Sequence, residues 1–456
     1  MRASGLFRFA LFLAIGFNSV SVLAEEFQDS SLQHLGPWLA NYRSYPVPDH
    51  LSPPPDNCRL LHVDYTGRHG SRYPKETETE LIPELLNYFY ELTSNFSLSE
   101  KGEKLFQKAR SFSTWTKAHL KCFSDITPRG WQELYDLGFR NTSFLTAFRR
   151  LPPKSLTISL SSSEITRTIH SQEAFWEGFS EALPEKVELT SYLNVLDNPR
   201  WVLHSYKLCR PVYGDFSFTH LKEEFSARKE TLEKNLPEAA VHFAREIMPD
   251  CPTEIAPRLL ETVYRLCLLD VSRKYPLGLC EVPAEWIDKP EGTKVLGWLR
   301  KIQSWRKFYD FGLSEYHQGK AINLASPLLR DILDQLEQGV YNNPENISAN
   351  YRFSHDSMIA KLLSKLEIIP PKGTDDERFA VWNPSYHTPM GANVQLHLYQ
   401  CSDNNLQIQL LLNEQQIDWK IPPCHNQPLC SWQQARDYLR DKIVPDEVLK
   451  EYCSVQ

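Results

Sequence analysis

The sequence lacks the surplus of positive charge that nucleic-acid-binding proteins carry. Its 456 residues include 50 Lys and Arg against 57 Asp and Glu, so the formal net charge at pH 7 is −7. Because a basic surplus is the electrostatic footprint of a nucleic-acid binder, we expect no nucleic acid partner. The negative total still leaves room for a locally positive pocket, since attraction of an anion depends on where the charges lie.

Long apolar runs are absent after the first residues. We therefore expect no transmembrane segment in the mature chain and no lipid-anchor tail. The cysteines mostly lack the paired short spacings typical of a zinc site. Internal repeats and low-complexity linkers are also missing, which argues against a repeat architecture.

The amino-terminal residues have the pattern of a secretory signal peptide. Arg2 precedes an apolar run at residues 9–15, and residues 22–24 supply a cleavage site. We expect residues 1–24 to be removed on export; a membrane anchor is the alternative, although the run is short for a span. The final compartment stays open among the extracellular space, a membrane-associated surface, the endoplasmic reticulum lumen and the lysosome.

Ten cysteines agree with export, because disulfides persist in oxidising compartments. Their even number predicts a disulfide framework whose pairing stays open, although Cys424 and Cys430 are close enough to close a small loop. Three sequons predict glycosylation at Asn95, Asn141 and Asn346.

The most informative stretch is a turn that follows an apolar segment. Residues 60–65 predict a buried strand, and the chain continues through the string Arg68-His69-Gly70-Ser71-Arg72-Tyr73-Pro74. Ligands of open α/β sheets lie at the carboxyl ends of strands, and the glycines allow close approach of the backbone. Arginine forks bind phosphate oxygens, and an imidazole among them can act as a nucleophile. The stretch therefore favours phosphoryl transfer; the alternative is a basic surface loop whose histidine caps a strand.

Polar residues stand at two more junctions between a strand and a helix. Residues 155–160 predict a strand, and Arg167 follows it before a helix that we expect to begin at Ser171. His355 and Asp356 lie between a short strand and helical residues 358–366. His355 can donate to a phosphate oxygen, and Asp356 can protonate a leaving alkoxide. The alternatives are a solvated loop arginine for Arg167 and an ordinary helix N-cap for Asp356.

These strings resemble the signatures of the histidine acid phosphatases. The string around His69 is most similar to phytases and multiple inositol polyphosphate phosphatases, which have Tyr before Pro. Residues 167–171 are similar to the family's Arg-Thr-X-X-Ser stretch. The pair at 355–356 is His-Asp, as in general acid phosphatases and phytases, whereas the inositol polyphosphate branch usually has His-Ala-Glu. Residues 385–414 resemble the closing hairpin of that branch, so the resemblance spans almost the whole mature chain.

The resemblance implies an α/β fold, with the phosphoglycerate mutase-like core sheet of the histidine phosphatases flanked by helices. We predict that residues 25–196 and 312–456 form this core. Residues 197–311 change to helical segments with scattered Trp and Cys, which predicts an inserted α-helical subdomain that roofs the site. Residues 326–338 have the apolar spacing of an amphipathic helix.

The resemblance also implies a phosphoric monoester hydrolase that acts through a phosphohistidine intermediate. His69 attacks phosphorus in this reading, and Asp356 protonates the leaving hydroxyl and later activates water. The residues expected to hold the phosphoryl oxygens are Arg68, Arg72, Arg167 and His355. We expect no metal or other cofactor, because guanidiniums supply the charge that Mg²⁺ supplies elsewhere.

The expected substrate is a small polyanion. Several guanidiniums suit inositol hexakisphosphate and lower inositol phosphates, and the family adds 2,3-bisphosphoglycerate. We expect Lys75 to bind substrate too, and Arg43 and Lys117 are candidates for the positive rim; the alternative is that each is a solvated surface charge. Two other functions stay open, a secreted acid phosphatase of broad specificity and a catalytically inactive phosphate-binding ectodomain. The sequence does not predict the oligomeric state.

Overall fold

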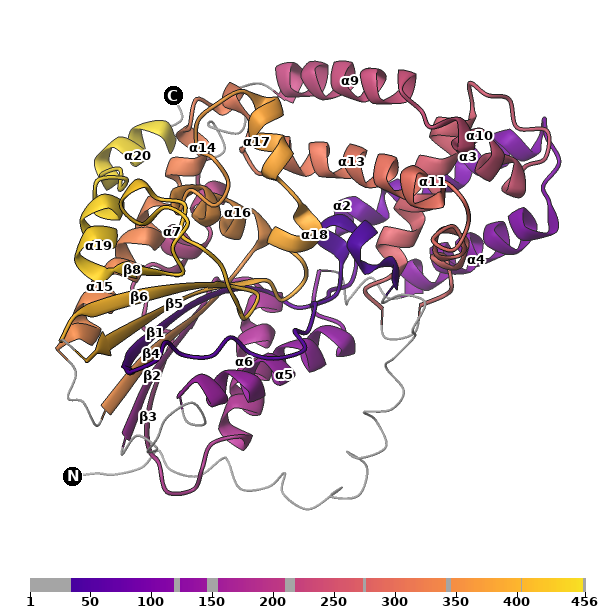
Figure 1. The fold of residues 1–456 in the computed structure, drawn as a ribbon. Helices are drawn as coiled ribbons and strands as arrows, with labels where there is room; N and C mark the ends of the chain where they lie inside the picture. Colours follow the sequence, from indigo (N-terminus) through magenta and orange to yellow (C-terminus); the bar gives the residue numbers. More distant parts are fainter. Residues whose placement is uncertain are drawn as a thin grey trace, which may run out of the picture.

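One mixed sheet organises the chain (Figure 1). The computed structural model describes residues 34–118, 124–145, 155–209, 218–273, 276–341, 346–402 and 404–453. In this part of the chain the strand order is β3-β2-β4-β1-β5-β6-β7, and β8 pairs with β6. The strands are β1 (Cys58–Arg68), β2 (Ser155–Ser162), β3 (Glu188–Leu193), β4 (Asn346–Ser354), β5 (Asn393–Cys401), β6 (Leu406–Leu412), β7 (Gln415–Gln416) and β8 (Leu429–Ser431).

Strands β2, β4 and β1 are neighbours and run parallel, which places their carboxyl ends at one edge of the sheet. The register pairs Arg68 of β1 with Ser354 of β4, and Ser162 of β2 with Phe353 of β4. Strands β5 and β6 continue the sheet in antiparallel fashion. Three segments that are far apart in the sequence therefore leave the sheet side by side.

Helices cover both faces of the sheet. On one face α5 (Pro128–Leu145) and α6 (Thr166–Glu181) pack over aromatic residues, with the rings of Phe175 and Tyr65 5.4 Å apart. The other face is covered by α7 (Pro199–Leu203), α15 (Ser326–Val340), α16 (Asp356–Lys365) and α19 (Trp432–Arg440). Each fully buried large apolar side chain contributes about 1.5–3 kcal/mol. The predicted fold class is confirmed, as are the predicted strands and the helix at 326–338.

A helical layer lies beyond one end of the sheet (Figure 1). It contains α3 (Leu81–Thr93), α4 (Glu100–Ala118), α9 (Phe218–Lys234), α10 (Glu238–Ile247), α11 (Ala256–Asp270), α12 (Glu281–Glu285) and α13 (Gly292–Asp310). Helices α3 and α4 precede the predicted insert, yet they pack against α11 and α10. The insert at 197–311 stays a prediction, but the helical layer extends beyond it because α3 and α4 share its apolar core.

Short elements connect these layers. They are α2 (Glu76–Thr79), α14 (Lys320–Asn323), α17 (Asp375–Val381), α18 (Pro384–His387), α20 (Asp446–Cys453), η1 (Gly36–Trp38), η2 (Ala40–Tyr42), η4 (Ser205–Lys207), η5 (Glu315–His317) and η6 (Pro422–Cys424).

Helix α6 begins at Thr166, five residues before the predicted start at Ser171. Residue Ile165 is extended, and the Thr168 hydroxyl donates to the Ile165 carbonyl at 2.7 Å. No residue between 166 and 170 interrupts a helix, so α6 extends back to Thr166, shortly after the end of β2. This correction places Arg167 in the first helical turn.

Disulfides tie the described chain at four places. The pairs are Cys58–Cys401, Cys209–Cys453, Cys267–Cys280 and Cys424–Cys430, and the last is the loop foreseen from the sequence. Cys251 is buried and has no disulfide partner among these residues, and Cys122 lies outside them. Such a framework agrees with export into an oxidising compartment. Within the described ranges, no helix has the length and apolar character needed to cross a membrane.

One glycosylation prediction is wrong. Asn141 is fully buried on the packed face of α5, where its amide donates to the Leu137 carbonyl at 2.9 Å. A glycan has no room there in the folded chain. Asn95 is exposed, so its sequon stays a prediction, and the side chain of Asn346 lies outside the described structure.

Candidate active site

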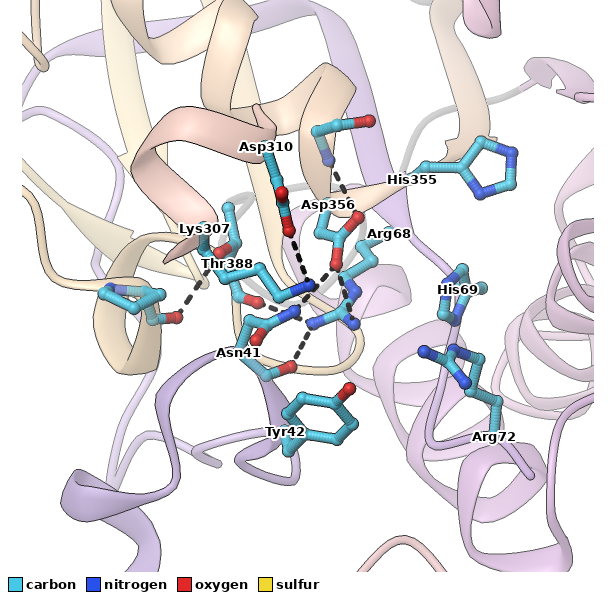
Figure 2. Close-up of polar contacts among 12 residues, drawn as sticks. Asn41, Tyr42, Arg68, His69, Arg72, Lys307, Asp310, His355, Asp356 and Thr388 are labelled. Carbon is cyan, nitrogen blue, oxygen red and sulfur yellow. Dashed lines mark hydrogen bonds and ion pairs between the residues drawn. The ribbon is translucent and has the colours of Figure 1, made fainter. Parts of the chain in front are cut away.

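The six predicted site residues come together at the edge where β1, β2 and β4 end. The imidazole centroids of His69 and His355 are 5.8 Å apart. Arg167 Nη2 lies 3.1 Å from His355 Nδ1, and Arg68 Nη2 lies 3.2 Å from Asp356 Oδ2. Figure 2 shows Arg72 beside His69. The parallel order of the three strands explains this convergence, because it brings their carboxyl-terminal loops to one edge.

His69 is oriented as a neutral nucleophile. Its ring is buried, and Nδ1 lies 2.9 Å from the carbonyl oxygen of Gly70. A carbonyl only accepts, so Nδ1 carries the proton and Nε2 keeps the lone pair. Burial lowers the pKa of His69 well below its ordinary value, and Arg167, Arg68 and Arg72 lower it further. The ring therefore stays neutral in mildly acidic solution.

Three guanidiniums around His69 have unused hydrogen-bond donors. The Nε atoms of Arg68, Arg72 and Arg167 are buried, and none has an acceptor among the described residues. Leaving a buried donor unpaired costs about 1–3 kcal/mol, and more for a charged group. Three such donors around one imidazole indicate a site for an anion with several oxygens, and a phosphoryl group supplies them.

Arg68 is the most deeply fixed of the three. It is fully buried, and its Nη1 donates to the carbonyl oxygens of Asn41 and Thr388, both at 2.6 Å. Burial lowers the pKa of Arg68, while Asp356 raises it. These two carbonyls lock the guanidinium in place, which leaves Nη2 and Nε facing other groups.

His355 is fully engaged by protein groups. Arg167 Nη2 can only donate, so His355 Nδ1 accepts at 3.1 Å and Nε2 donates to the Ser163 hydroxyl at 3.0 Å. His355 thus orients Arg167 in this arrangement. Its expected donation to a phosphate oxygen stays a prediction and requires either that Nε2–H leave the Ser163 hydroxyl or that Nδ1 gain a proton after Arg167 releases it.

Asp356 is the first residue of α16 rather than its N-cap, which is His355. Its Oδ1 accepts from the backbone N–H of Ser357 at 2.9 Å, and Oδ2 accepts from the Asn41 amide at 2.9 Å. Burial alone would raise the pKa of Asp356, but Arg68, Lys75 and Lys307 outweigh it and hold the pKa well below its ordinary value. The carboxylate is therefore ionised.

Lysines from two distant elements act on that carboxylate. Lys75 follows the motif loop, and burial with nearby Arg72 lowers its pKa to about 7. Lys307 belongs to α13 of the helical layer; Figure 2 shows its amine on the side of Asp356 that faces Arg68 and Asn41. Lys307 also lies 3.3 Å from Asp310, and its side chain is only 15% exposed. Lys117 is exposed on α4, and Arg43 donates to the Ser385 carbonyl, so neither reaches this group.

Several site residues had no signal in the sequence. Asn41 contacts both Arg68 and Asp356, although Asp356 is 315 residues away in the sequence. Lys307 comes from a helix with an ordinary amphipathic pattern. Ala40, before Asn41, has φ 49°, a left-handed conformation that costs a non-glycine residue about 1–2 kcal/mol. Glu78 pairs with Arg72. Spatial proximity alone reveals these residues.

Gly70 of the motif also packs against a helix. A Cβ on Gly70 would meet the carbonyl oxygen of Gly130 at 2.4 Å, so the loop packs directly on the first turn of α5. The Gly70 N–H also donates to the Ser171 hydroxyl at 3.1 Å. Gly70 is therefore required for packing between the loop and α5.

Comparisons with known proteins agree with this site. The family model described as the histidine phosphatase superfamily (branch 2) matches residues 59–413. Phytase A of Aspergillus oryzae is 29% identical over 154 residues, which cover 34% of this chain and 30% of that protein. A thiamine-repressible acid phosphatase of Schizosaccharomyces pombe is 24% identical over 422 residues, covering 87% of this chain and 84% of that protein.

Two solved structures share the fold. The multiple inositol polyphosphate phosphatase of Bifidobacterium longum, in complex with inositol hexasulfate, has a TM-score of 0.64 and 15% identity, covering 90% of this chain and 99% of that chain. The phytase from D. castellii has a TM-score of 0.54 and 16% identity, covering 94% and 90%. At these identities the likeness concerns the fold alone. With the matched family model and the arginine-lined histidine, the chain belongs to the histidine phosphatase superfamily (branch 2), as the motif around His69 predicted, and is a phosphoric monoester hydrolase.

Proposed function

We propose that the protein hydrolyses phosphomonoesters of inositol polyphosphates, inositol hexakisphosphate and its lower products, through a phosphohistidine. The observation that carries this proposal is the set of three buried, unpaired guanidinium Nε–H groups around a neutral imidazole. These donors suit the equatorial oxygens of a transferring phosphoryl group. The imidazole supplies the nucleophile.

In the first step His69 Nε2 attacks phosphorus, and the bond between phosphorus and the leaving oxygen breaks. Asp356 gives its proton to that oxygen, so the product alcohol leaves neutral. The surrounding cations favour the ionised form of Asp356. A bound phosphate adds negative charge beside Arg68 and thereby weakens the cations' hold on the carboxylate, which raises its affinity for a proton.

In the second step water attacks the phosphohistidine. Asp356, now deprotonated, accepts a proton from that water, and the bond between phosphorus and Nε2 breaks. Inorganic phosphate and neutral His69 are regenerated. Arg68, Arg72 and Arg167 hold the phosphoryl oxygens in both steps and offset their charge.

The polyphosphate specificity rests on Lys75 and Lys307. Both charges act on Asp356, the residue that faces the leaving oxygen in this mechanism. Cations beside the general acid lie next to the leaving alcohol, so they favour an alcohol that carries further phosphates. 2,3-Bisphosphoglycerate has a second phosphate on its leaving fragment as well and is a further candidate substrate.

The site lies in a chain that we propose is exported by way of the signal peptide at 1–24 and glycosylated at Asn95. The four disulfides support the secretory route.

The test is a comparison of two substrates in the presence of EDTA. Purified enzyme should release phosphate from inositol hexakisphosphate, with the isomers resolved over time, at a higher kcat/KM than from 4-nitrophenyl phosphate. His69→Ala should abolish release from both while the thermal unfolding temperature is retained. Equal or better use of the aryl ester would favour a broad-specificity acid phosphatase, and no release from either would favour an inactive phosphate-binding ectodomain. Turnover that survives His69→Ala would refute the nucleophile.

A further inference from the structure

Glu78 holds one edge of the Arg72 guanidinium. Arg72 Nη1 donates to Glu78 Oε2 and Arg72 Nη2 donates to Glu78 Oε1, each at 2.8 Å. Arg72 Nη1 also donates to the carbonyl oxygen of Tyr73 at 2.9 Å. The Arg72 side chain is almost fully buried, so these contacts are shielded from water. The carboxylate therefore fills the edge formed by the two Nη atoms.

The contact leaves one other edge of Arg72 available. A guanidinium is planar and carries its five hydrogens in a fixed geometry, so fixing two nitrogens also fixes the third. The unused donors are the Nε hydrogen and the second hydrogen of Nη2. Nε is buried and has no acceptor within the described chain. That edge can still bind two oxygens of one phosphoryl group.

Glu78 is itself held in a single position. The Tyr42 hydroxyl donates to Oε1 at 2.9 Å, and the backbone N–H of Lys75 donates to Oε2 at 2.8 Å. In the second contact, an acidic side chain in the first turn of a helix accepts from the backbone N–H of the residue that precedes the helix, as in a capping box. Burial alone would raise the pKa of Glu78, but Arg72 holds it well below its ordinary value, so the carboxylate stays ionised in acid. An ionised carboxylate with four donors has little freedom to turn.

We propose that Glu78 is a positioning residue for catalysis: by occupying the Nη edge of Arg72, it directs the Nε edge toward the transferring phosphoryl group. The proposal rests on the phosphatase function proposed above. It assigns no contact between Glu78 and substrate. Its consequence is that Glu78 contributes to turnover only while Arg72 is present.

A double-mutant cycle tests this consequence. Glu78→Ala should lower kcat/KM about 100-fold, the loss typical of a misplaced catalytic group. In an Arg72→Ala background the same change should alter kcat/KM less than about threefold, because no guanidinium remains to position. Glu80→Ala serves as the matched control, since Glu80 is exposed two residues away and should leave kcat/KM unchanged.

A second readout separates positioning from a structural effect. Vanadate mimics the five-coordinate transition state, whereas inorganic phosphate does not, so Glu78→Ala should weaken vanadate inhibition more than phosphate inhibition. If Glu78→Ala does not fold, Glu78→Gln and Tyr42→Phe carry the same test, each with a loss of roughly 10-fold that again vanishes without Arg72. Equal inhibition losses, independent effects in the cycle, or an unchanged kcat/KM would overturn the proposal. Failure of the wild-type enzyme to release phosphate would instead refute the proposed function.

Discussion

Replacing Asp356 by Asn is the sharpest test of the proposed chemistry, because it removes one proton-transfer group with almost no change in volume. The amide cannot satisfy all the contacts of the carboxylate. Oδ1 accepts from the Ser357 N–H and Oδ2 accepts from Asn41, each at 2.9 Å. Whichever way the amide turns, its NH₂ meets another donor. We expect a loss of stability of about 1–3 kcal/mol, and a fold that survives it.

The chemical loss is larger and depends on the leaving group. A positioned general acid contributes about 10²–10⁴-fold, which equals roughly 2.7–5.5 kcal/mol of barrier. An inositol hydroxyl is a poor leaving group and needs the proton. 4-Nitrophenolate leaves without it. Asp356→Asn should therefore lose about 10²–10⁴-fold on inositol hexakisphosphate and much less in the first step with 4-nitrophenyl phosphate.

The assay is pre-steady-state release of nitrophenolate. In the variant the second step lacks its base, so the phosphohistidine should accumulate. Nitrophenolate should then appear in a rapid burst that approaches the enzyme concentration, followed by slow turnover. The control is the same assay with His69→Ala, which should show no burst and so ties the accumulating species to that imidazole.

A particular result would refute this reasoning. If Asp356→Asn slowed the burst on the aryl ester as much as turnover of inositol hexakisphosphate, loss of the proton would not be the cause. A damaged phosphate site would be the better explanation, and weaker inhibition by inorganic phosphate would identify it.

Three further predictions concern the charges around the site. Burial and the arginines lower the pKa of His69, and cations hold the pKa of Asp356 low, so the nucleophile stays neutral while the acid gains its proton as pH falls. The kcat/KM on inositol hexakisphosphate should therefore rise from neutral pH into the mildly acidic range. A kcat/KM that decreases as the pH falls below about 6.5 would contradict this. The pKa of Lys75 is lowered to about 7, so KM for the hexakisphosphate should rise above that pH, and Lys75→Arg should remove the rise, since arginine stays charged. Lys307→Gln should raise KM for the hexakisphosphate about 10-fold and leave KM for 4-nitrophenyl phosphate nearly unchanged. The control is Lys117→Gln, because Lys117 is exposed on α4. Equal effects on both esters would show that Lys307 does not recognise the leaving fragment.

Local patterns predicted much of the fold. The apolar segment before Arg68, the alternating residues of β2 and the amphipathic spacing of α15 each follow from the periodicity of one element, so they could be read without tertiary information. The start of α6 and the buried sequon at Asn141 were misread, because helix boundaries and the packed face of a helix depend on what the element meets. Periodicity also could not show that α3 and α4 join the helical layer, since they do so through contacts with residues far along the chain.

The sequence by itself determined which residue types the site contains. The motif around His69, Arg167 at the start of α6 and the His355-Asp356 pair each stand where a strand gives way to a helix, and parallel neighbouring strands bring such junctions together. Only the tertiary structure decided how those groups are held. Asn41 on Asp356, Glu78 on Arg72 and Lys307 beside Asp356 come from segments with no motif, because a contact requires a group at the right place in space and not a neighbour in sequence. The physical reason is that the type of side chain fixes which reactions a residue can perform, whereas its orientation and its pKa depend on burial and on the charges that the fold brings within a few ångströms.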